Sequence, residues 1–341
     1  MLVRLGRPKY LLYSWVLCTL GVVVAAYTGH PVDFAKYLHA LLFVWGVHLM
    51  THYCNEYFDL AADKANPMPT KWTGGSRVLV EGALEPSVSL SASFVLLFFC
   101  VALLPAMPCP GQYVGITAIT LAWFYTAPPF RFNYRGLGEV IVTTVLNGCF
   151  PLMGYSLTTG ELSWFPAMLL LPAIIVQYVR MTIMNLADYQ GDLLVGKRTA
   201  AVVLGPRTIV HMHAVGQATA YLLLVPAVLW GGLPLAVALC MAMTSPLALW
   251  QVVRLYQGEY LDPRTGNNVV FWASSHCSLV VVAAYVGLLL QGYQSGTFVL
   301  EGPESLLTRL FLLPLLVYGV IIQGQIRANR IQPALVESVS A

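Results

Sequence analysis

The chain has 341 residues, of which 58% are hydrophobic and only 10% are charged, and its mean hydropathy is +0.71. Soluble proteins carry about 25% charged residues, so the composition excludes an ordinary soluble domain and predicts an integral protein of the lipid bilayer. The formal net charge of +3 is small and no basic block occurs, which argues against a nucleic-acid-binding protein.

Ten apolar segments are long enough to cross a hydrocarbon core of about 30 Å, which takes roughly 20 helical residues. They cover residues 10–28, 36–57, 88–106, 111–127, 137–159, 164–187, 208–230, 234–253, 268–291 and 307–325. We therefore predict an all-α, polytopic bundle that forms one membrane domain over residues 1–341. Two similar acidic motifs lie four spans apart, which predicts two four-helix halves, about 10–135 and 136–253, followed by C-terminal helices within 268–325.

The distribution of basic residues orients these spans. If the N-terminus is inside, 15 of the 18 Lys and Arg residues fall in inner segments, whereas only Lys36 and Arg309 fall outside. Such an asymmetry predicts that both termini face the cytoplasm, as in a plasma (inner) membrane protein. The outer loops are short and nearly uncharged, so we expect the active site on the cytoplasmic face.

The second span ends in HLMTHYCNEYFDLAAD, residues 48–63, which carries Asn55, Asp59 and Asp63 at a spacing of four. This spacing places the three side chains along one helical face, each about 6 Å from the next. Clustered carboxylates at a membrane edge repel one another and are costly to desolvate unless a cation neutralises them. Because magnesium prefers oxygen ligands and commonly bridges carboxylates to substrate phosphates, the array predicts a magnesium–phosphate site.

Two histidines, His48 and His52, lie on the same helical face as Asn55. An HxxxH pair can bind zinc, but the glutamate of an HExxH motif is missing. We interpret the pair as buried polar contacts between helices, or as acceptor-binding residues.

An aromatic inner loop follows the fourth span in WFYTAPPFRFNYRGLGE, residues 123–139, where two prolines end the helix. Arg131 and Arg135 lie among its aromatic side chains, which include Tyr125. One interpretation is an interfacial aromatic belt with cytoplasmic basic anchors. The other is a wall of the active cavity, with aromatic faces near a developing cation and arginines near phosphate.

A second acidic array, formed by Asn185, Asp188 and Asp192, lies in MNLADYQGDLLVGKRT. Two arrays at matching places in two helical halves predict a two-sided metal–diphosphate clamp. Basic residues follow both arrays: Lys71 and Arg77 after the first, and Lys197 and Arg198 after the second. Arg180 is charged within the sixth span and needs a partner, either diphosphate or an array carboxylate, unless it snorkels to the inner surface.

These motifs resemble the UbiA superfamily of membrane prenyltransferases, and within it the MenA branch of 1,4-dihydroxy-2-naphthoate polyprenyltransferases. The resemblance covers roughly residues 4–292 and rests on Arg7-Pro8, NEYFD…D, GGSR at 74–77, YTAPPF at 125–130, YRGLGE at 134–139 and NLADYQGDLLVGKRT at 185–199. Three features depart from the family pattern: Ala187 replaces a basic residue, Gly75 replaces a proline, and a tenth span exceeds the usual nine.

The resemblance implies a helical bundle around a central cavity that opens sideways to the lipid. It also implies magnesium-dependent transfer of an isoprenyl chain from a prenyl diphosphate to an aromatic acceptor, here 1,4-dihydroxy-2-naphthoate in menaquinone-type quinone biosynthesis. The implied catalytic and Mg2+-binding residues are Asp59, Asp63, Asp188 and Asp192. The implied substrate-binding residues are Asn55, Lys71, Arg77, Tyr125, Arg131, Arg135, Arg180, Asn185, Lys197 and Arg198.

Three other functions stay open from the sequence. The acceptor can be another aromatic compound, such as 4-hydroxybenzoate or homogentisate. The same fold can cyclise a prenyl diphosphate without any acceptor, as a terpene cyclase does. A transporter is disfavoured, because it would carry charges along a path to both faces. Prenyl chain length and oligomeric state are not specified by the sequence.

Overall fold

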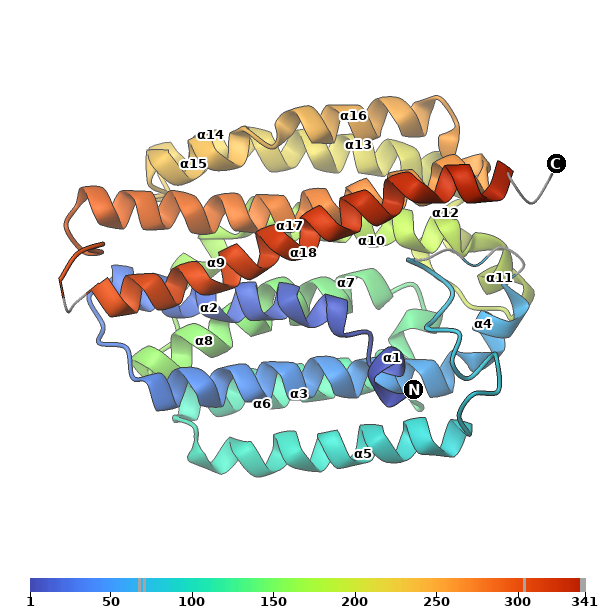
Figure 1. Cartoon of the computed structure of the whole chain (residues 1–341), viewed down its shortest axis with the longest axis horizontal. Helices are drawn as coiled ribbons and strands as arrows, with labels where there is room; N and C mark the ends of the chain where they lie inside the picture. Colours follow the sequence, from blue (N-terminus) through green and yellow to red (C-terminus); the bar gives the residue numbers. More distant parts are fainter. Residues whose placement is uncertain (67–68, 70–71, 303–304, 338–341) are drawn as a thin grey trace.

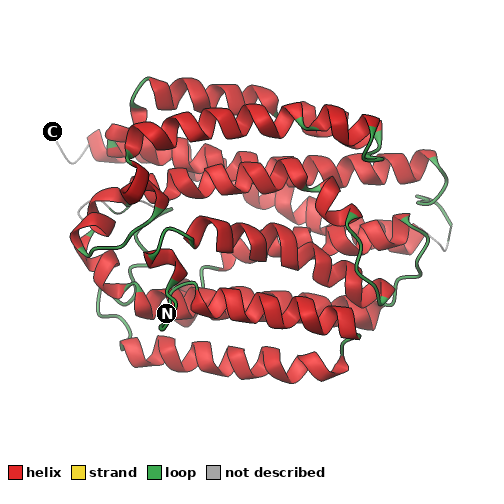
Figure 2. Cartoon of the chain, turned by 180° about the vertical axis from the view of Figure 1, so that it is seen from behind, coloured by secondary structure: helices red, strands yellow, loops and turns green. Residues whose placement is uncertain are grey.

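The computed structural model describes residues 1–66, 69, 72–302 and 305–337 of the chain. Long helices run side by side along the length of the molecule, and loops join them at its two ends (Figures 1 and 2). Within the described residues no strand forms, apart from a single backbone bridge between Arg135 and Arg198. The predicted all-α bundle is therefore confirmed.

Each predicted span corresponds to one helix or to consecutive helices. They are α2 (Leu11–Tyr27), α3 (Phe34–Phe58), α5 (Pro86–Leu103), α6 (Cys109–Phe124), α7 (Gly138–Thr143) with the π-helical turn η4 (Thr144–Cys149) and α8 (Phe150–Thr159), α9 (Phe165–Leu169) with α10 (Leu171–Ala187), α13 (Pro206–Leu222) with α14 (Leu224–Leu229), α15 (Leu235–Ala242) with α16 (Ser245–Tyr256), α17 (Pro263–Gln294) and α18 (Ser305–Glu337). Short helices connect them: α1 (Leu2–Leu5), α4 (Leu60–Ala65), α11 (Tyr189–Leu194), α12 (Ala200–Leu204), and the 3-10 turns η1 (Pro8–Tyr10), η2 (Leu104–Ala106), η3 (Phe132–Tyr134) and η5 (Glu259–Leu261).

Seven of these segments, within the described part of the chain, are long and apolar enough to cross a membrane. The 17-residue α10 is apolar but shorter, and α3 and α6 are not among the seven. A helix of 16 or 17 residues rises only about 25 Å, which falls slightly short of the hydrocarbon thickness. The chain is therefore a multi-pass membrane protein in which some of the helices next to the polar site are not ideal spans.

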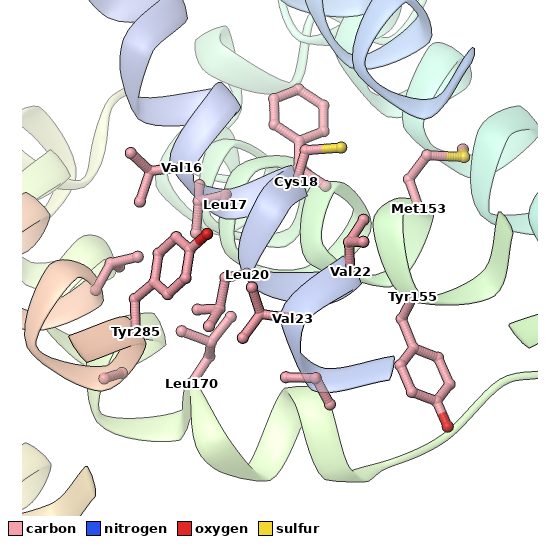
Figure 3. Close-up of a cluster of buried hydrophobic side chains, with 14 of the residues drawn as sticks. Val16, Leu17, Cys18, Leu20, Val22, Val23, Met153, Tyr155, Leu170 and Tyr285 are labelled. Atoms are coloured by element: carbon pink, nitrogen blue, oxygen red, sulfur yellow. The ribbon is translucent and has the colours of Figure 1, made fainter. Parts of the chain in front are cut away.

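Helix α2 forms the centre of the apolar core, as Figure 3 shows around Val16, Leu20 and Val23. It packs closely against α8 because two glycines face the contact. A Cβ at Gly21 would lie 1.9 Å from the carbonyl oxygen of Pro151, and one at Gly154 would lie 2.1 Å from that of Cys18. Small residues at such contacts let membrane helices approach closely, so these glycines fix the packing of α2 against α8.

The polar loops gather at one end of the bundle. Figure 1 shows α4, α11, the N-terminal α1 and the C-terminal end of α18 toward the same end. Both predicted acidic arrays therefore lie at the end that also holds the N-terminus. Their orientation relative to the cytoplasm stays a prediction, as does the division into two four-helix halves.

Candidate active site

A cavity of about 260 Å³ opens inside the bundle near α4 and α11. Its wall combines acidic, basic and apolar side chains from α2, α3, α10, α17 and α18. The predicted site residues that line it are Asn55, Asp59, Asp63, Tyr125, Arg180, Asn185, Asp188 and Lys197. Asp192 lies buried beside them and contacts Lys197.

The first array is built on a break between two helices. Helix α3 ends at Phe58, Asp59 adopts φ −95° and ψ 3°, and α4 begins at Leu60. The predicted single helical face is therefore interrupted at Asp59. The backbone N–H groups of Asp59 and Asp63 still donate to the backbone carbonyls four residues earlier. The amide of Asn55 donates to Asp59 Oδ2 at 2.6 Å, which fixes the orientation of that carboxylate.

The second array repeats this backbone turn. Helix α10 ends at Ala187, Asp188 adopts φ −95° and ψ 4°, and α11 begins at Tyr189. Its side-chain partners differ, because Asn185 donates to Glu139 Oε1 at 2.7 Å and not to Asp188. The two arrays therefore share one backbone turn, at Asp59 and at Asp188.

Each array is held by a residue that follows the other array. Lys197, after the second array, lies 3.1 Å from Asp59 Oδ2 and 3.4 Å from Asp192 Oδ1. Asn66, after the first array, donates to Asp188 Oδ1 at 2.7 Å. The close approach requires a glycine, since a Cβ at Gly191 would lie 2.9 Å from Cα of Asn66. The two arrays thus form one polar cluster.

Burial and mutual repulsion shape the charge of this cluster. Burial raises the pKa of Asp63 to about 7, and the nearby Asp59 carboxylate adds to the rise. Burial also raises the pKa of Asp192 to about 7 and that of Asp188 to about 6, while Lys197 opposes both shifts. Burial lowers the pKa of Lys197, but Asp59 and Asp192 outweigh it and hold that pKa well above its usual value. The amine is therefore charged, whereas Asp63, Asp188 and Asp192 take up protons at a higher pH than ordinary carboxyl groups do.

The carboxylate oxygens of this cluster fit a hard divalent cation. Asp59 Oδ1 and Asp192 Oδ2 are buried without a hydrogen-bond partner in the described part of the chain. Unsatisfied buried carboxylate oxygens are costly, so they suit a ligand that brings positive charge. No three Asp, Glu, His or Cys side chains among the described residues are grouped closely enough to hold an ion by themselves. Mg2+ needs no such group, because it commonly takes one or two carboxylates and completes its shell with substrate phosphates and water.

A glycine turn packs directly on the first array. Gly75 has φ +77°, and a Cβ there would lie 2.2 Å from Asp63 Oδ2. Proline cannot adopt this φ, so glycine in place of the expected proline has a local reason. Arg77 Nη1 donates to the backbone oxygen of Asp63 at 2.5 Å, and Arg77 is absent from the cavity lining. Arg77 therefore supports the backbone of Asp63 and does not face the cavity.

Two buried glutamates support the arrays and were missed from the sequence. Glu56 pairs with Arg7, and it accepts hydrogen bonds from the backbone and hydroxyl of Ser76, both at 2.7 Å. Glu139 accepts from Asn185 and, at 2.9 Å, from the backbone amide of Ala200. A charged residue inside an apolar segment was the available signal, since each needs a polar partner from a distant part of the chain.

Besides Arg77, three more of the predicted arginines lie outside the cavity lining. Arg131 stacks over Tyr134 with 3.7 Å between its Cζ and the ring centroid. Arg135 is exposed and donates to the Pro129 carbonyl at 3.0 Å, while Arg198 is exposed and pairs with it through the backbone. Lys71 lies outside the described residues. The aromatic loop contributes Tyr125 to the cavity but aims its basic side chains elsewhere.

The histidine pair makes contacts between segments, one of the two interpretations from the sequence, and both residues also line the cavity, so acceptor binding stays a prediction. His48 Nδ1 lies 2.9 Å from Ser14 Oγ, and His52 Nδ1 lies 2.7 Å from the Gly6 carbonyl oxygen. Because a carbonyl can only accept, His52 carries its proton on Nδ1. Arg7 and Lys9, beside this segment, line the cavity and add positive charge that sequence reasoning did not assign to the site.

The sequence matches known proteins over most of its length. The profile of the UbiA prenyltransferase family matches residues 14–275. A 1,4-dihydroxy-2-naphthoate octaprenyltransferase from Bacillus subtilis (strain 168) is 24% identical over 234 residues, covering 67% of this chain and 73% of the relative. A protein of the same name from Mycobacterium leprae (strain TN) is 27% identical over 294 residues, covering 82% and 96%. A digeranylgeranylglyceryl phosphate synthase from Thermococcus kodakarensis is 27% identical over 212 residues, covering 62% and 72%.

Solved structures share the fold. The apo structure of a UbiA homolog from Aeropyrum pernix K1 aligns with a TM-score of 0.64 at 16% identity, covering 83% of this chain and 98% of that one. A UbiA homolog from Archaeoglobus fulgidus, bound to DMAPP and Mg2+, aligns with a TM-score of 0.59 at 16% identity, covering 84% and 98%.

Proposed function

The chain belongs to the UbiA prenyltransferase family, and on that premise we propose that it transfers an isoprenyl chain from a prenyl diphosphate to an aromatic acceptor with Mg2+. The strongest support is the cluster of two aspartate turns, in which Asp59 and Asp192 keep buried oxygens without partners. Such a cluster at a membrane edge is costly unless it serves a charged ligand.

Asp59, Asp63, Asp188 and Asp192 are the residues that would hold Mg2+. The ion would neutralise the diphosphate and stabilise its departure. The Archaeoglobus fulgidus homolog bound to DMAPP and Mg2+ supports this metal. Lys197 contributes a fixed positive charge between the two turns, in the place where diphosphate charge would be held. Lys9 and Arg7, which pairs with Glu56, line the same cavity.

The reaction that follows needs an aromatic and dry surrounding. When the bond between the allylic carbon and the diphosphate oxygen breaks, the chain becomes a carbocation that Tyr125 can stabilise with its ring face. Apolar residues such as Phe150, Ile141 and Val145 form another part of the wall and exclude water. The electron-rich acceptor ring then attacks the cation and loses a proton, or carbon dioxide in the case of dihydroxynaphthoate.

We favour 1,4-dihydroxy-2-naphthoate as the acceptor, in menaquinone-type quinone biosynthesis. Two relatives with that acceptor in their names support it, and so do the YRGLGE and GKRT motifs. A relative named for a digeranylgeranylglyceryl phosphate, at a similar identity, supports a prenylated glyceryl phosphate as a second candidate acceptor. We also propose a plasma (inner) membrane location with the site facing the cytoplasm.

Purified protein supplied with Mg2+, a prenyl diphosphate and a panel of acceptors tests the proposal. We expect diphosphate release and prenylated product only when Mg2+ and an acceptor are both present, with dihydroxynaphthoate preferred to 4-hydroxybenzoate and homogentisate. Diphosphate release at full rate without any acceptor, together with a terpene product, would instead identify a cyclase.

A further inference from the structure

The cavity continues past the aspartate turns into a second polar region between α10, α17 and α18. We call it the inner polar pocket and define it by Gln177, Arg180, Ser274, Cys277 and Tyr318, all of which line the cavity. It contains a basic group but no acidic one. A charged side chain inside a membrane bundle marks a functional site by default, provided that its partner can be named.

Arg180 points away from the aspartate turns. It lies eight residues before Asp188 in α10, a rise of about 12 Å along a helix. Helical side chains lean toward the N-terminus of their helix, which carries the guanidinium farther from Asp188. The contacts agree, because Nε donates to Ser274 Oγ at 3.2 Å and Nη1 lies 3.5 Å from Gln177 Oε1, one turn earlier.

No carboxylate in the described part of the chain forms an ion pair with Arg180. Of the array carboxylates predicted as its partners, Asp59 and Asp192 pair instead with Lys197, and Asp188 accepts from Asn66. Along α10, Arg180 lies more than two helical turns from the turn residue Asp188. A half-buried charge needs a partner of opposite charge. An anion bound within the inner polar pocket would supply that partner to the Arg180 guanidinium.

Two further donors in the pocket lack acceptors. Gln177 is fully buried, its Oε1 accepts from Cys277 Sγ at 3.0 Å, and its Nε2 has no hydrogen-bond partner among the described residues. Tyr318 is also buried, and its hydroxyl, which approaches Ser278, makes no hydrogen bond of normal geometry within the described chain. A cation and two free donors in one cavity match an oxyanion.

Helix α18 closes the pocket from a part of the chain that follows the family match at residues 14–275. Its residues Tyr318, Ile321, Ile322 and Gln325 line the cavity. The spacing of three, four and seven places them on one helical face. Figure 1 shows α18 crossing in front of α17 toward the end that holds α11. The tenth predicted span, helix α18, is therefore a wall of the substrate cavity and not only an additional membrane anchor.

We propose that Arg180, Gln177 and Tyr318 bind the oxyanion of the acceptor, while the aspartate turns bind the diphosphate. The oxyanion is the carboxylate of an aromatic acid or the phosphate of a prenylated glyceryl phosphate. This inference rests on the prenyl transfer proposed above and assigns the acceptor end of the same cavity. It also gives the anionic acceptor a cation in place of the basic residue that Ala187 replaces.

Acceptor kinetics of Arg180→Gln, Arg180→Lys and Tyr318→Phe test this assignment. We expect Arg180→Gln to raise the KM for dihydroxynaphthoate roughly ten- to a hundredfold, because a charge-assisted contact is lost. The KM for prenyl diphosphate should change less than about twofold, the scale of a substitution outside its binding site. Arg180→Lys should restore part of the loss, since it keeps the charge without the planar fork. The exposed Arg309→Gln, on the same helix as Tyr318, is the matched control.

The same variants are compared on naphthalene-1,4-diol, which has no carboxylate. Loss of the preference for dihydroxynaphthoate in Arg180→Gln supports the pocket, and a retained preference overturns it. An equal or larger rise in the KM for prenyl diphosphate also overturns it, because Arg180 would then belong to the diphosphate site. If Arg180→Gln does not fold, Arg180→Lys and Tyr318→Phe give the same readout.

Direct binding separates this inference from the function on which it rests. If the wild-type protein transfers no prenyl group, the proposed function fails, and calorimetry with dihydroxynaphthoate and with a prenylated glyceryl phosphate judges the pocket alone. Weaker binding to Arg180→Gln of whichever probe the wild type binds supports the pocket and identifies the source of the oxyanion. Binding of neither probe by the wild type, or unchanged binding by the variant, overturns it.

Discussion

The turns at Asp59 and Asp188 have the same backbone but different surroundings. Their φ and ψ angles agree to within one degree. Asp59 accepts from Asn55, four residues earlier, and pairs with Lys197, whereas Asp188 accepts from the neutral amide of Asn66. Asn185 lies three residues before Asp188, so its position corresponds to Glu56 and not to Asn55. The residue at the position of Asn55 is Met184.

The two turns therefore have the same backbone conformation, but the side chains that contact Asp59 and Asp188 differ in charge. Each has a buried polar residue, Glu56 or Asn185, that anchors it to a neighbouring segment. Lys197 pairs with the turn residue itself in the first array, Asp59, but in the second array it pairs with Asp192, four residues after the turn residue Asp188. We therefore expect both aspartates to be needed for the reaction, and the residues around them to differ in importance.

Replacing either turn aspartate should have the largest effect. Asp59→Asn and Asp188→Asn keep the side-chain shape but remove a metal-binding charge, so we expect kcat to fall about a hundredfold or more. Asp33→Asn, at the exposed start of the same helix as Asn55, is the matched control because Asn also caps helices. A turn variant that keeps more than about a tenth of the wild-type rate would remove that aspartate from the clamp.

Substitutions of Lys197 and of Asn66 should lower the free energy of unfolding by different amounts. Lys197→Met leaves Asp59 and Asp192 without their shared cation, which costs about 3–5 kcal/mol when a buried ion pair is broken. Asn66→Ala removes one hydrogen bond to a carboxylate, about 1.5–3 kcal/mol at most. Denaturant titration in detergent measures both, with the exposed Lys36→Met as control. Equal losses, or a larger one for Asn66→Ala, would contradict the charge difference between the turns.

A substitution at Gly75 should disturb the first aspartate turn and leave the second one unchanged. Gly75→Ala places a methyl group against the Asp63 carboxylate and forces a side chain into positive φ. We expect about a tenfold loss in Mg2+-dependent turnover, as for a misplaced catalytic group. Gly160→Ala has the same φ of +77° in open space, so it should cost only about 1 kcal/mol of stability. Similar turnover in the two variants would show that the Gly75 contact does not position Asp63.

Substitutions of the two supporting glutamates, Glu56 and Glu139, should show the smallest difference in the free energy of unfolding. Glu56→Gln loses the charge partner of Arg7 and should lower the free energy of unfolding by about 2–3 kcal/mol. Glu139→Gln keeps an oxygen that can accept from both Asn185 and Ala200, so we expect a loss of about 1 kcal/mol. Thermal unfolding of the purified variants measures the contrast, and a larger loss for Glu139→Gln would reverse the assigned roles.

The sequence was sufficient for the all-α membrane bundle and for bringing the two acidic arrays to attention, because hydropathy and the spacing of carboxylates are local signals. It did not predict the break at Asp59, since a spacing of four continues through the break as it would through one helix. The backbone conformation of two arginines was also hidden. Arg77 and Arg131 have φ +67° and +44°, and their side chains contact Asp63 and Tyr134 instead of lining the cavity.

Partners that are distant in sequence could not be predicted from one chain. Glu56 meets Arg7 and Ser76, and Glu139 meets Asn185 and Ala200, across packing that only the folded bundle sets. The role of the tenth span was hidden for the same reason. Its cavity-lining face becomes visible only when α18 lies against the rest of the bundle.

The central claim is that the two turns bind one diphosphate together through Mg2+. A double-mutant cycle on prenyl diphosphate affinity, measured by calorimetry with and without Mg2+, tests it most directly. For a single clamp, Asp59→Asn, Asp188→Asn and the double variant should each lose nearly all of the Mg2+-dependent affinity, so the single losses should not add. Additive losses, or one variant with wild-type Mg2+-dependent affinity, would contradict the account.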